Sequence, residues 1–167
     1  MILYQIVYGK VPNDLKYHVE RTQSFAKDSQ WDYELIEKPE IENPLARCAQ
    51  SNWDRFNLME EGRVYFDLDA YPTEDFTLES EYNFAHYPHN CSGAKPQPYS
   101  FIFSCPKKFA QTVLSGVQKK GIADQYCWPA KILRRYEKQI SMIDPEHYVH
   151  DMYTARKHIF HKESHHE

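Results

Sequence analysis

The sequence predicts an α/β fold in which a mixed, mostly parallel sheet is flanked by helices. Apolar runs rich in β-branched and aromatic residues stand at 2–8, 63–67 and 100–105. These runs do not alternate with polar residues, which indicates strands that are covered on both faces. Segments with helical spacing lie between the first strands, so that strand, helix and strand follow one another from the start of the chain. Because such a crossover joins parallel strands, we expect a mainly parallel sheet.

Length and charge limit the class of protein. The chain has 167 residues, and we expect a single domain over 1–153 and a His-rich tail over 154–167. The net charge of −4 argues against a broad nucleic-acid binding surface, although a local basic patch remains possible around Lys131, Arg134, Arg135 and Lys138. No apolar run approaches the length of a membrane span. With no export signal and cysteines that match no zinc pattern, we expect a cytoplasmic protein with reduced thiols.

The first elements follow from breakers and periodicity. A strand is expected at 2–8 and a turn at 9–13, where Gly9 and Pro12 interrupt regular structure. A helix then runs to about residue 27, because side chains recur at helical spacing at Leu15, Val19, Thr22 and Ala26. Residues 32–37 alternate between apolar and charged side chains and predict the second strand.

A helix, a stop and a strand form the centre of the sequence. Asn43 is a good helix cap, and Pro44 suits the first helical position. We expect this helix to run to Glu61, where Gly62 would end it in the left-handed conformation. The strand at 63–67 follows directly.

Two carboxylates stand at the end of that strand, Asp67 and Asp69. Side chains two apart on a strand point the same way, so these two can face one site. Ligands of open α/β sheets sit beyond the carboxyl ends of the strands, an edge that Gly9 would share. Facing carboxylates repel each other unless a cation compensates, and a hard divalent cation does so most simply. The alternative is a solvated turn, because an acidic chain often carries Asp-x-Asp by chance.

The second half of the chain is less regular. Residues 71–98 are rich in proline and read as a loop, with one short strand near 82–85. A buried strand follows at 100–105, and Pro106 opens a helix that runs through residue 117. A further helix starts at Trp128 and carries Ile132, Leu133, Tyr136 and Ile140.

The sequence from 46 to 70 resembles a known motif. The helix reads Ser51-Asn52-Trp53-Asp54-Arg55-Phe56, and Gly62-Arg63-Val64-Tyr65-Phe66-Asp67-Leu68-Asp69 follows. This is similar to the sugar-binding region of DXD-containing glycosyltransferases, the group with initiating mannosyltransferases and capsular polysaccharide transferases. That group has Ser-Asp-x-x-Arg-Tyr, then Leu, then Gly-Gly-x-Tyr-x-Asp-x-Asp. Asn52 stands where the group has Asp, and Arg63 where it has the second Gly.

Two further stretches agree with the resemblance. Residues 2–9 are similar to the group's opening Ile-Ile-His-Gln-Ile-Trp-Phe-Gly and keep Gln5 and Gly9. Residues 159–164 resemble a closing His that is followed by Ser-Trp, with His165 in place of Trp. The group's Thr-Gly-Pro segment is not recognisable here.

The resemblance implies a GT-A (Rossmann-like) fold and a small, metal-dependent, hexosyltransferase-like glycosyltransferase. Such an enzyme moves a sugar from a UDP- or GDP-sugar donor to a glycan, lipid or protein acceptor, with retention of configuration. It uses Mn²⁺ or Mg²⁺, which neutralises the charge that develops on the diphosphate leaving group.

The resemblance also assigns roles to residues. Asp69 and His161 are the implied metal ligands, and Asp67 would contact the ribose or the sugar. Arg55 is placed to bind the donor sugar or Asp67, and the equally weighted alternative is a structural salt bridge. The nucleotide-binding set is Gln5, Ile6, Tyr8, Gly9, Asn52 and Asp67. Tyr4 and Tyr8 can either stack on the base or pack in the core.

Two other functions are compatible with the sequence. A degenerate transferase would bind a nucleotide sugar without turning it over, which the changes at Asn52 and Arg63 and the short chain favour somewhat. A metal-dependent phosphohydrolase also uses paired aspartates at a strand end, but normally needs more converging acids. The sequence names no nucleophile; Glu79 and Glu81 are candidates, and a solvated acidic loop is the favoured interpretation of both.

Overall fold

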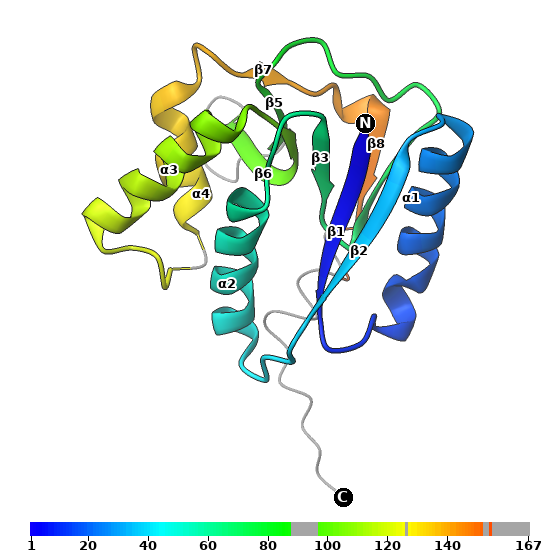
Figure 1. Ribbon diagram of the computed structural model, residues 1–167, viewed down its shortest axis with the longest axis horizontal. Coiled ribbons are helices and arrows are strands. Elements are labelled where there is room, and N and C mark those ends of the chain that lie inside the picture. The colour runs from blue at the N-terminus through cyan, green and yellow to red at the C-terminus, as the bar shows by residue number, and fades with distance from the viewer. Residues whose placement is uncertain (88–96, 126, 152–153, 155–167) are drawn as a thin grey trace, which may run out of the picture.

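The computed structural model describes residues 1–87, 97–125, 127–151 and 154. One six-stranded sheet has the order β2-β1-β3-β6-β5-β7, and a two-stranded sheet pairs β4 with β8 (Figure 1). The strands are β1 (Ile2–Tyr8), β2 (Asp32–Lys38), β3 (Arg63–Phe66), β4 (Ala70–Pro72), β5 (Asn83–Tyr87), β6 (Gln97–Ser104), β7 (Ser141–Met142) and β8 (Tyr148–His150). The helices are α1 (Lys16–Asp28), α2 (Pro44–Asn57), α3 (Lys107–Lys120) and α4 (Trp128–Leu133), with short 3-10 helices η1 (Asn13–Leu15), η2 (Arg134–Tyr136) and η3 (Pro145–His147).

The sheet is mixed, as the sequence predicts. Strand β1 lies parallel to both β2 and β3, because α1 and α2 carry the chain back between these strands. Strand β6 is antiparallel to β3 and β5, and β5 is parallel to β7. The predicted α/β class is therefore confirmed, and the four main predicted strands form one sheet.

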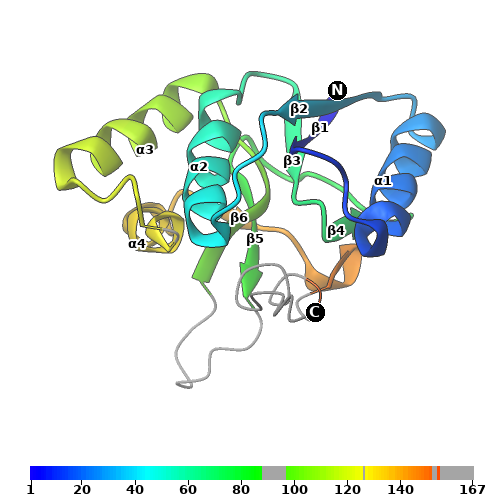
Figure 2. The same cartoon turned by 90° about the horizontal axis from the view of Figure 1, so that it is seen from below.

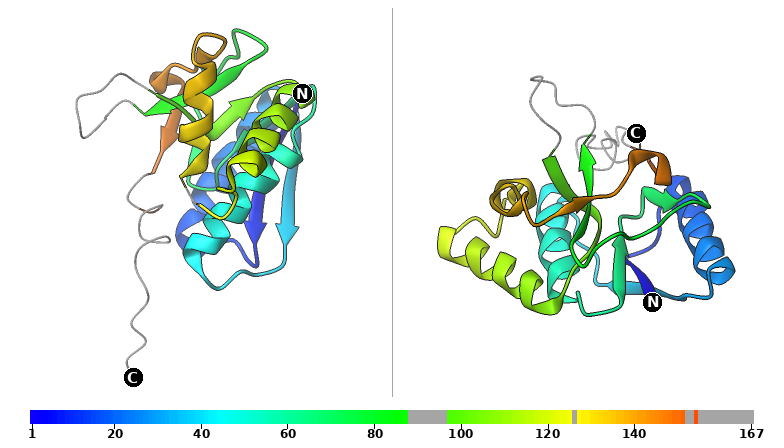
Figure 3. Two further views of the ribbon diagram at one scale, coloured as in Figure 1. Left: turned by 90° about the vertical axis from the view of Figure 1, so that its left-hand side faces the viewer. Right: turned by 90° about the horizontal axis from the view of Figure 1, so that it is seen from above.

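Helices cover both faces of the sheet. Helix α1 lies against one face, and α2, α3 and α4 lie against the other (Figures 2 and 3). Side chains of β1 alternate between the two layers: Tyr4 and Ile6 belong to the apolar cluster under α2, α3 and α4, whereas Leu3 belongs to the cluster under α1. Both clusters are dominated by aromatic rings, so the many Phe, Tyr and Trp residues mainly fill the core.

Parallel pairing brings the ends of β1 and β3 to the same edge of the sheet. Gly9 follows β1 with a φ of +81°, and its backbone N–H donates to the Lys38 carbonyl over 2.9 Å. A Cβ at this position would lie 3.3 Å from the Cβ of Glu40. Gly9 thus lets the loops after β1 and β2 approach closely.

One helix ends earlier than the sequence predicts. Helix α2 stops at Asn57 rather than at Glu61, and Asn43 caps its start by accepting the Ala46 N–H. The chain leaves the helix where Met59 becomes fully buried in the core. Gly62 has the expected positive φ of +78°, but it closes a separate turn rather than the helix.

Other boundaries also shift. Helix α3 continues beyond residue 117 to Lys120 and ends on Gly121, which has a φ of +62°. The predicted helix from Trp128 tightens into η2 after Leu133 and does not reach Ile140. The very short strands β4, β7 and β8 have no counterpart in the prediction. In the ranges that the structure describes, no helix has the length and apolarity to cross a membrane. The predicted tail lies outside the described residues, apart from Thr154.

Candidate functional site

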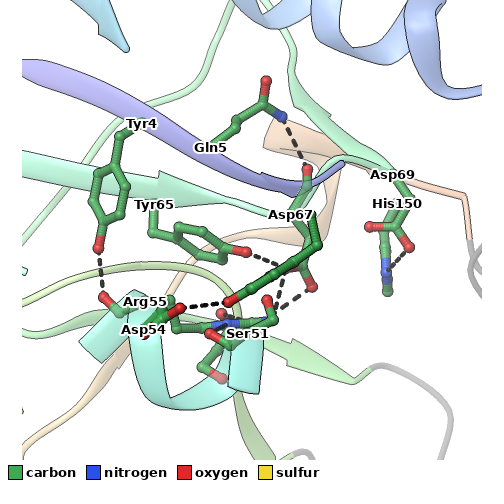
Figure 4. A network of polar contacts seen from close by, with 11 residues as sticks. Tyr4, Gln5, Ser51, Asp54, Arg55, Tyr65, Asp67, Asp69 and His150 are labelled. Carbon is green, nitrogen blue, oxygen red and sulfur yellow. Dashed lines mark hydrogen bonds and ion pairs between the residues drawn. The ribbon is translucent and has the colours of Figure 1, made fainter. Parts of the chain in front are cut away.

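A network of polar contacts surrounds the Asp67 carboxylate just beyond β3 (Figure 4). The Arg55 guanidinium approaches it with both terminal nitrogens, at 2.9 Å from Oδ1 and 3.3 Å from Oδ2. The Tyr65 hydroxyl donates to Oδ1 over 2.5 Å. Because Arg55 comes from α2 and Tyr65 from β3, the carboxylate joins the helix to the strand.

Every N–H group of the Arg55 guanidinium has a partner within the protein. Besides the two bonds to Asp67, Nε donates to the Ser51 carbonyl, and the terminal nitrogens donate to Ser51 Oγ and the Ser100 carbonyl, at 3.2, 3.0 and 2.9 Å. The guanidinium also lies 4.7 Å from the centre of the Tyr65 ring. Of the two interpretations of Arg55, the structure therefore favours the ion pair with Asp67 over direct contact with a sugar.

Burial governs the charges of this pair. Burial raises the pKa of the Asp67 carboxyl, while the Arg55 guanidinium opposes that shift, as does the Tyr65 hydroxyl. Burial also opposes the charge on Arg55, but the charges of Asp67, Tyr65, Cys48 and Tyr8 together outweigh burial and raise the pKa of the guanidinium. The ionised form of Asp67 thus depends on Arg55.

The backbone of Asp67 is fixed as firmly as its side chain. Its N–H donates to the Phe101 carbonyl over 2.7 Å, and its carbonyl accepts from Gln5 Nε2 and from the Ala70 N–H, each at 3.1 Å. The Gln5 oxygen accepts from the Tyr33 hydroxyl over 2.8 Å. Gln5 is fully buried, so in this structure it supports the turn after β3 from below.

Asp69 has a different partner, His150. Its Oδ2 lies 3.4 Å from Nε2 of His150, and both side chains are largely buried. Strand β3 ends at Phe66 and the Ala70 N–H closes a turn onto Asp67, so the alternation of a strand does not extend over these residues. The two carboxylates consequently face separate partners rather than a single shared point.

His150 is a candidate that the sequence prediction missed. It belongs to β8, which pairs with β4 and sets His150 opposite Ala70. Its ring stacks on Phe101, with centres 4.0 Å apart. A lone histidine in a three-residue strand carries no motif, and only the pairing of β8 with β4 brings it to Asp69.

The charge of His150 responds to its neighbours. Burial lowers the pKa of the imidazole, but the bond to Asp69 and the charges of Asp69, Asp67 and Asp151 outweigh burial and raise it. Asp151 in turn fixes the end of β8. Its N–H donates to the Asp69 carbonyl over 2.8 Å, and its carboxylate accepts from the Thr154 N–H and hydroxyl, at 3.0 and 2.7 Å.

The residues predicted to bind the nucleotide differ in how deeply they are buried. Ile6 is buried in the core, and Tyr4 is fully buried with its hydroxyl donating to the Arg55 carbonyl over 2.5 Å. Tyr4 therefore packs in the core. Tyr8 is partly exposed beside Gly9, and its hydroxyl donates to the Asp54 carboxylate over 2.6 Å. Asn52 is buried on α2, one turn before Arg55.

Other candidates lie away from Asp69 or outside the described residues. Glu79 and Glu81 are exposed, and Glu81 lines a groove with Met1 and Gly62 at the opposite, amino-terminal edge of the sheet. Their position supports a solvated acidic loop. His161 lies outside the described residues.

Few of the described side chains near Asp69 are placed to act as ligands of a divalent ion. Within 1–87, 97–125 and 127–151, no group of three His, Cys, Asp or Glu side chains is placed to hold a metal. Asp69 and His150 offer one carboxylate oxygen and one imidazole nitrogen, both of which Mn²⁺ accepts. Two protein ligands are enough for an ion that takes its remaining ligands from substrate phosphates and water.

Comparison with known proteins extends the description of the fold. No protein-family model matches the chain, and no curated protein matches it. Among solved structures, the chain is similar to a glycosyltransferase involved in the glycosylation of the major capsid of PBCV-1. The TM-score is 0.63 at 13% sequence identity, over 95% of this chain and 98% of that chain. The similarity shows that the two chains share a fold.

The Asp67 network generates a prediction about stability. Because Arg55 cannot lose its proton, Asp67→Asn leaves a buried cation without its counter-charge, and we expect a loss of about 3 kcal/mol in the free energy of unfolding. Glu34→Gln is the matched control: it removes an exposed carboxylate from the ion pair with Arg63 and should cost about 1 kcal/mol or less. Urea unfolding measures both. Equal losses in the two variants would show that the buried pair contributes no more than a surface pair.

His150 generates a prediction about pH. Since Asp69 raises the pKa of His150 in the folded state, the stabilisation is fully present below the pKa of an unfolded histidine, about 6.5, and is lost as the pH rises through the folded pKa. Without metal, His150→Gln should therefore lower Tm by about 2–4 °C near pH 5.5, for a pair worth about 1 kcal/mol, and by less near pH 9. His147→Gln, which removes a histidine from η3 and leaves the pair of His150 and Asp69 in place, is the matched control. A loss for His150→Gln that is independent of pH would contradict the ion pair.

Proposed function

We propose that the chain is a small glycosyltransferase that moves a sugar from a nucleotide-sugar donor to an acceptor. The observation that carries this proposal is the hydrogen-bonded Asp67–Asp69 turn at the carboxyl end of β3, which stands between Arg55 and His150. The fold shared with a glycosyltransferase over nearly the whole chain supports it. So does the resemblance of 46–70 to the sugar-binding region of DXD-containing transferases.

The donor would bind across the carboxyl ends of β1 and β3. Ligands of open α/β sheets sit at this edge. Gly9 and the partly exposed Tyr8 lie at the end of β1, on the nucleotide side, and Asp69 lies at the diphosphate side, beyond β3. The side chains of Gln5 and Ile6 are buried, so they would support the donor site from beneath its surface.

Asp67 and Arg55 take different parts in this proposal. About a quarter of the Asp67 side chain is exposed, and its carboxylate has capacity beyond the bonds to Arg55 and Tyr65. Asp67 can therefore accept a hydroxyl of the ribose or the sugar. Arg55 acts as a positioning residue that holds this carboxylate charged and in place.

Asp69 and His150 would hold the divalent ion, Mn²⁺ or Mg²⁺. When bound, the ion supplies a Lewis acid that neutralises the charge on the departing diphosphate. Ligation requires His150 to be neutral, so the proton that Asp69 favours on this imidazole has to leave when a cation binds. The resemblance names His161 as a ligand, and it would complete the same site from the tail.

A second candidate function is nucleotide-sugar binding without turnover. Of the other described carboxylates, Asp151 lies near Asp69 but binds Thr154 and His18, and Glu79 and Glu81 lie on the acidic loop, so none is assigned as a nucleophile. Retention through a covalent intermediate needs such a residue, and this observation therefore keeps the binding protein as the alternative, although a front-side route needs none. A phosphohydrolase fits less well, because it normally needs more converging acids, whereas Asp67 and Asp69 face separate partners.

Donor hydrolysis tests the proposal. We expect slow release of free sugar from at least one member of a panel of UDP- and GDP-sugars, with dependence on Mn²⁺ or Mg²⁺. Asp69→Asn should abolish the metal-dependent part, whereas Asp75→Asn, a change in an exposed carboxylate, should leave it intact. Binding of a sugar nucleotide without sugar release would favour the binding protein. Release of nucleoside monophosphate and sugar 1-phosphate without release of free sugar would favour the phosphohydrolase.

A second test asks which histidine serves the metal. Calorimetry with UDP and with GDP, in Mn²⁺ and in chelator, measures metal-dependent binding. We expect His150→Ala to weaken it by about tenfold or more, as the loss of a metal ligand does. His161→Ala should have an effect of similar size if the tail completes the site, and His147→Ala is the control on η3. Equal affinities of His150→Ala and the parent would remove His150 from the metal site.

A further inference from the structure

A groove of about 500 Å³ lies between α2 and the end of α3, two helices that pack against each other and diverge towards the end of α3 (Figure 1). Its lining comes from α2, from the last turn of α3 and from the loop that follows α3: Ala46, Ala49, Gln50, Trp53, Gln118, Ala123 and Asp124. Its volume is within the range of small-molecule sites.

The groove is separate from the site at Asp67. On α2, the lining residues recur three or four apart, and so share one face. Ser51 and Arg55, which bind at the Asp67 network, lie about half a turn away from Ala49 and Trp53 around the helix axis. The two faces of α2 therefore serve two different places on the molecule.

The lining combines one large aromatic side chain with small and polar ones. Three alanines leave space between the helices, and the half-buried Trp53 indole forms a wall. Two amides and a carboxylate, Gln50, Gln118 and Asp124, provide donors and acceptors for hydroxyl groups.

The charge of the lining argues against anionic ligands. The described residues that line the groove include an aspartate and no lysine or arginine, so phosphate groups and nucleic acid would find no counter-charge there. An uncharged ligand with many hydroxyls and an apolar ring face fits instead: hydroxyls bond to amides and carboxylate, and the ring face packs on indole.

One polar group is already oriented before any ligand arrives. Gln50 Nε2 donates to Asp54 Oδ1 over 3.0 Å, and Asp54 Oδ2 accepts from the Tyr8 hydroxyl over 2.6 Å. This chain of bonds fixes the Gln50 amide and links the groove to the end of β1. A fixed donor and acceptor lowers the entropic cost of binding.

We propose that this groove binds a neutral saccharide, a segment of the acceptor glycan remote from the transferred sugar. The role as an acceptor site rests on the proposed transferase function, whereas the binding of saccharide rests on the groove alone. A chain held there on the outer face of α2 would be anchored while its end reaches the carboxyl edge of the sheet.

Trp53 fluorescence tests the proposal. A Trp31→Phe background leaves Trp53 and the fully buried Trp128 as the emitting residues. Titration with maltohexaose, cellohexaose, chitohexaose and mannohexaose should change the emission for at least one saccharide. In the same background, the double change Gln118→Ala and Asp124→Ala removes two exposed polar groups and should weaken that binding by about tenfold.

Gln111→Ala is the matched control. Gln111 is also an exposed glutamine on α3, two turns before Gln118, and it is not part of the groove. No response to any of the four saccharides, or equal weakening by Gln111→Ala, would overturn the proposal. Trp53→Leu should abolish binding measured by calorimetry, and retention of full affinity in that variant would also overturn it.

Donor hydrolysis in the same proteins separates this proposal from the proposed function. The Gln118→Ala and Asp124→Ala protein should hydrolyse the donor at the parent rate, because these residues lie away from Asp69. Hydrolysis without saccharide binding would overturn the groove alone. Saccharide binding without hydrolysis of any donor would support the groove as a binding site and overturn the transferase.

Discussion

The ion pair between Arg55 and Asp67 is the interaction on which the candidate site depends. It is buried and bidentate, and it ties α2 to the end of β3, while the Ser100 carbonyl adds β6 to the same guanidinium. A guanidinium is suited to this place because its planar fork satisfies several acceptors at once. Since a buried charge without a partner is costly, each member constrains the other, and the turn after β3 can adopt few alternative conformations.

Because of this constraint, the two aspartates are held in place by different parts of the fold. Asp67 is held by α2 and β3, whereas Asp69, two residues later, is held by β8 through His150 and the Asp151 backbone. The turn between them therefore connects the main sheet to the two-stranded sheet. A cation at Asp69 would compete with the His150 proton, which couples metal binding to pH at this point and leaves Asp67 with its own counter-charge.

Helix α2 presents different kinds of side chain on its two opposite faces. Towards the sheet it presents Ser51, Asn52 and Arg55, and towards α3 it presents alanines, Gln50 and Trp53. The Gln50–Asp54–Tyr8 chain of bonds passes between these faces and reaches the end of β1. The helix thus acts as a common wall of a site at the sheet edge and a groove outside it.

The sequence by itself determined the mixed sheet, its four main strands and the position of Asp67 and Asp69 beyond a buried strand. These follow from local signals: apolar runs, the Asn43 cap and the breakers Gly9 and Gly62 act over a few residues. Only the tertiary structure decided that α2 ends early to bury Met59, that Arg55 is fully occupied by protein partners, and that His150 reaches Asp69. Each of these depends on contacts between residues far apart in the chain, such as the pairing of β8 with β4. A short segment of sequence does not show which distant residues it will contact.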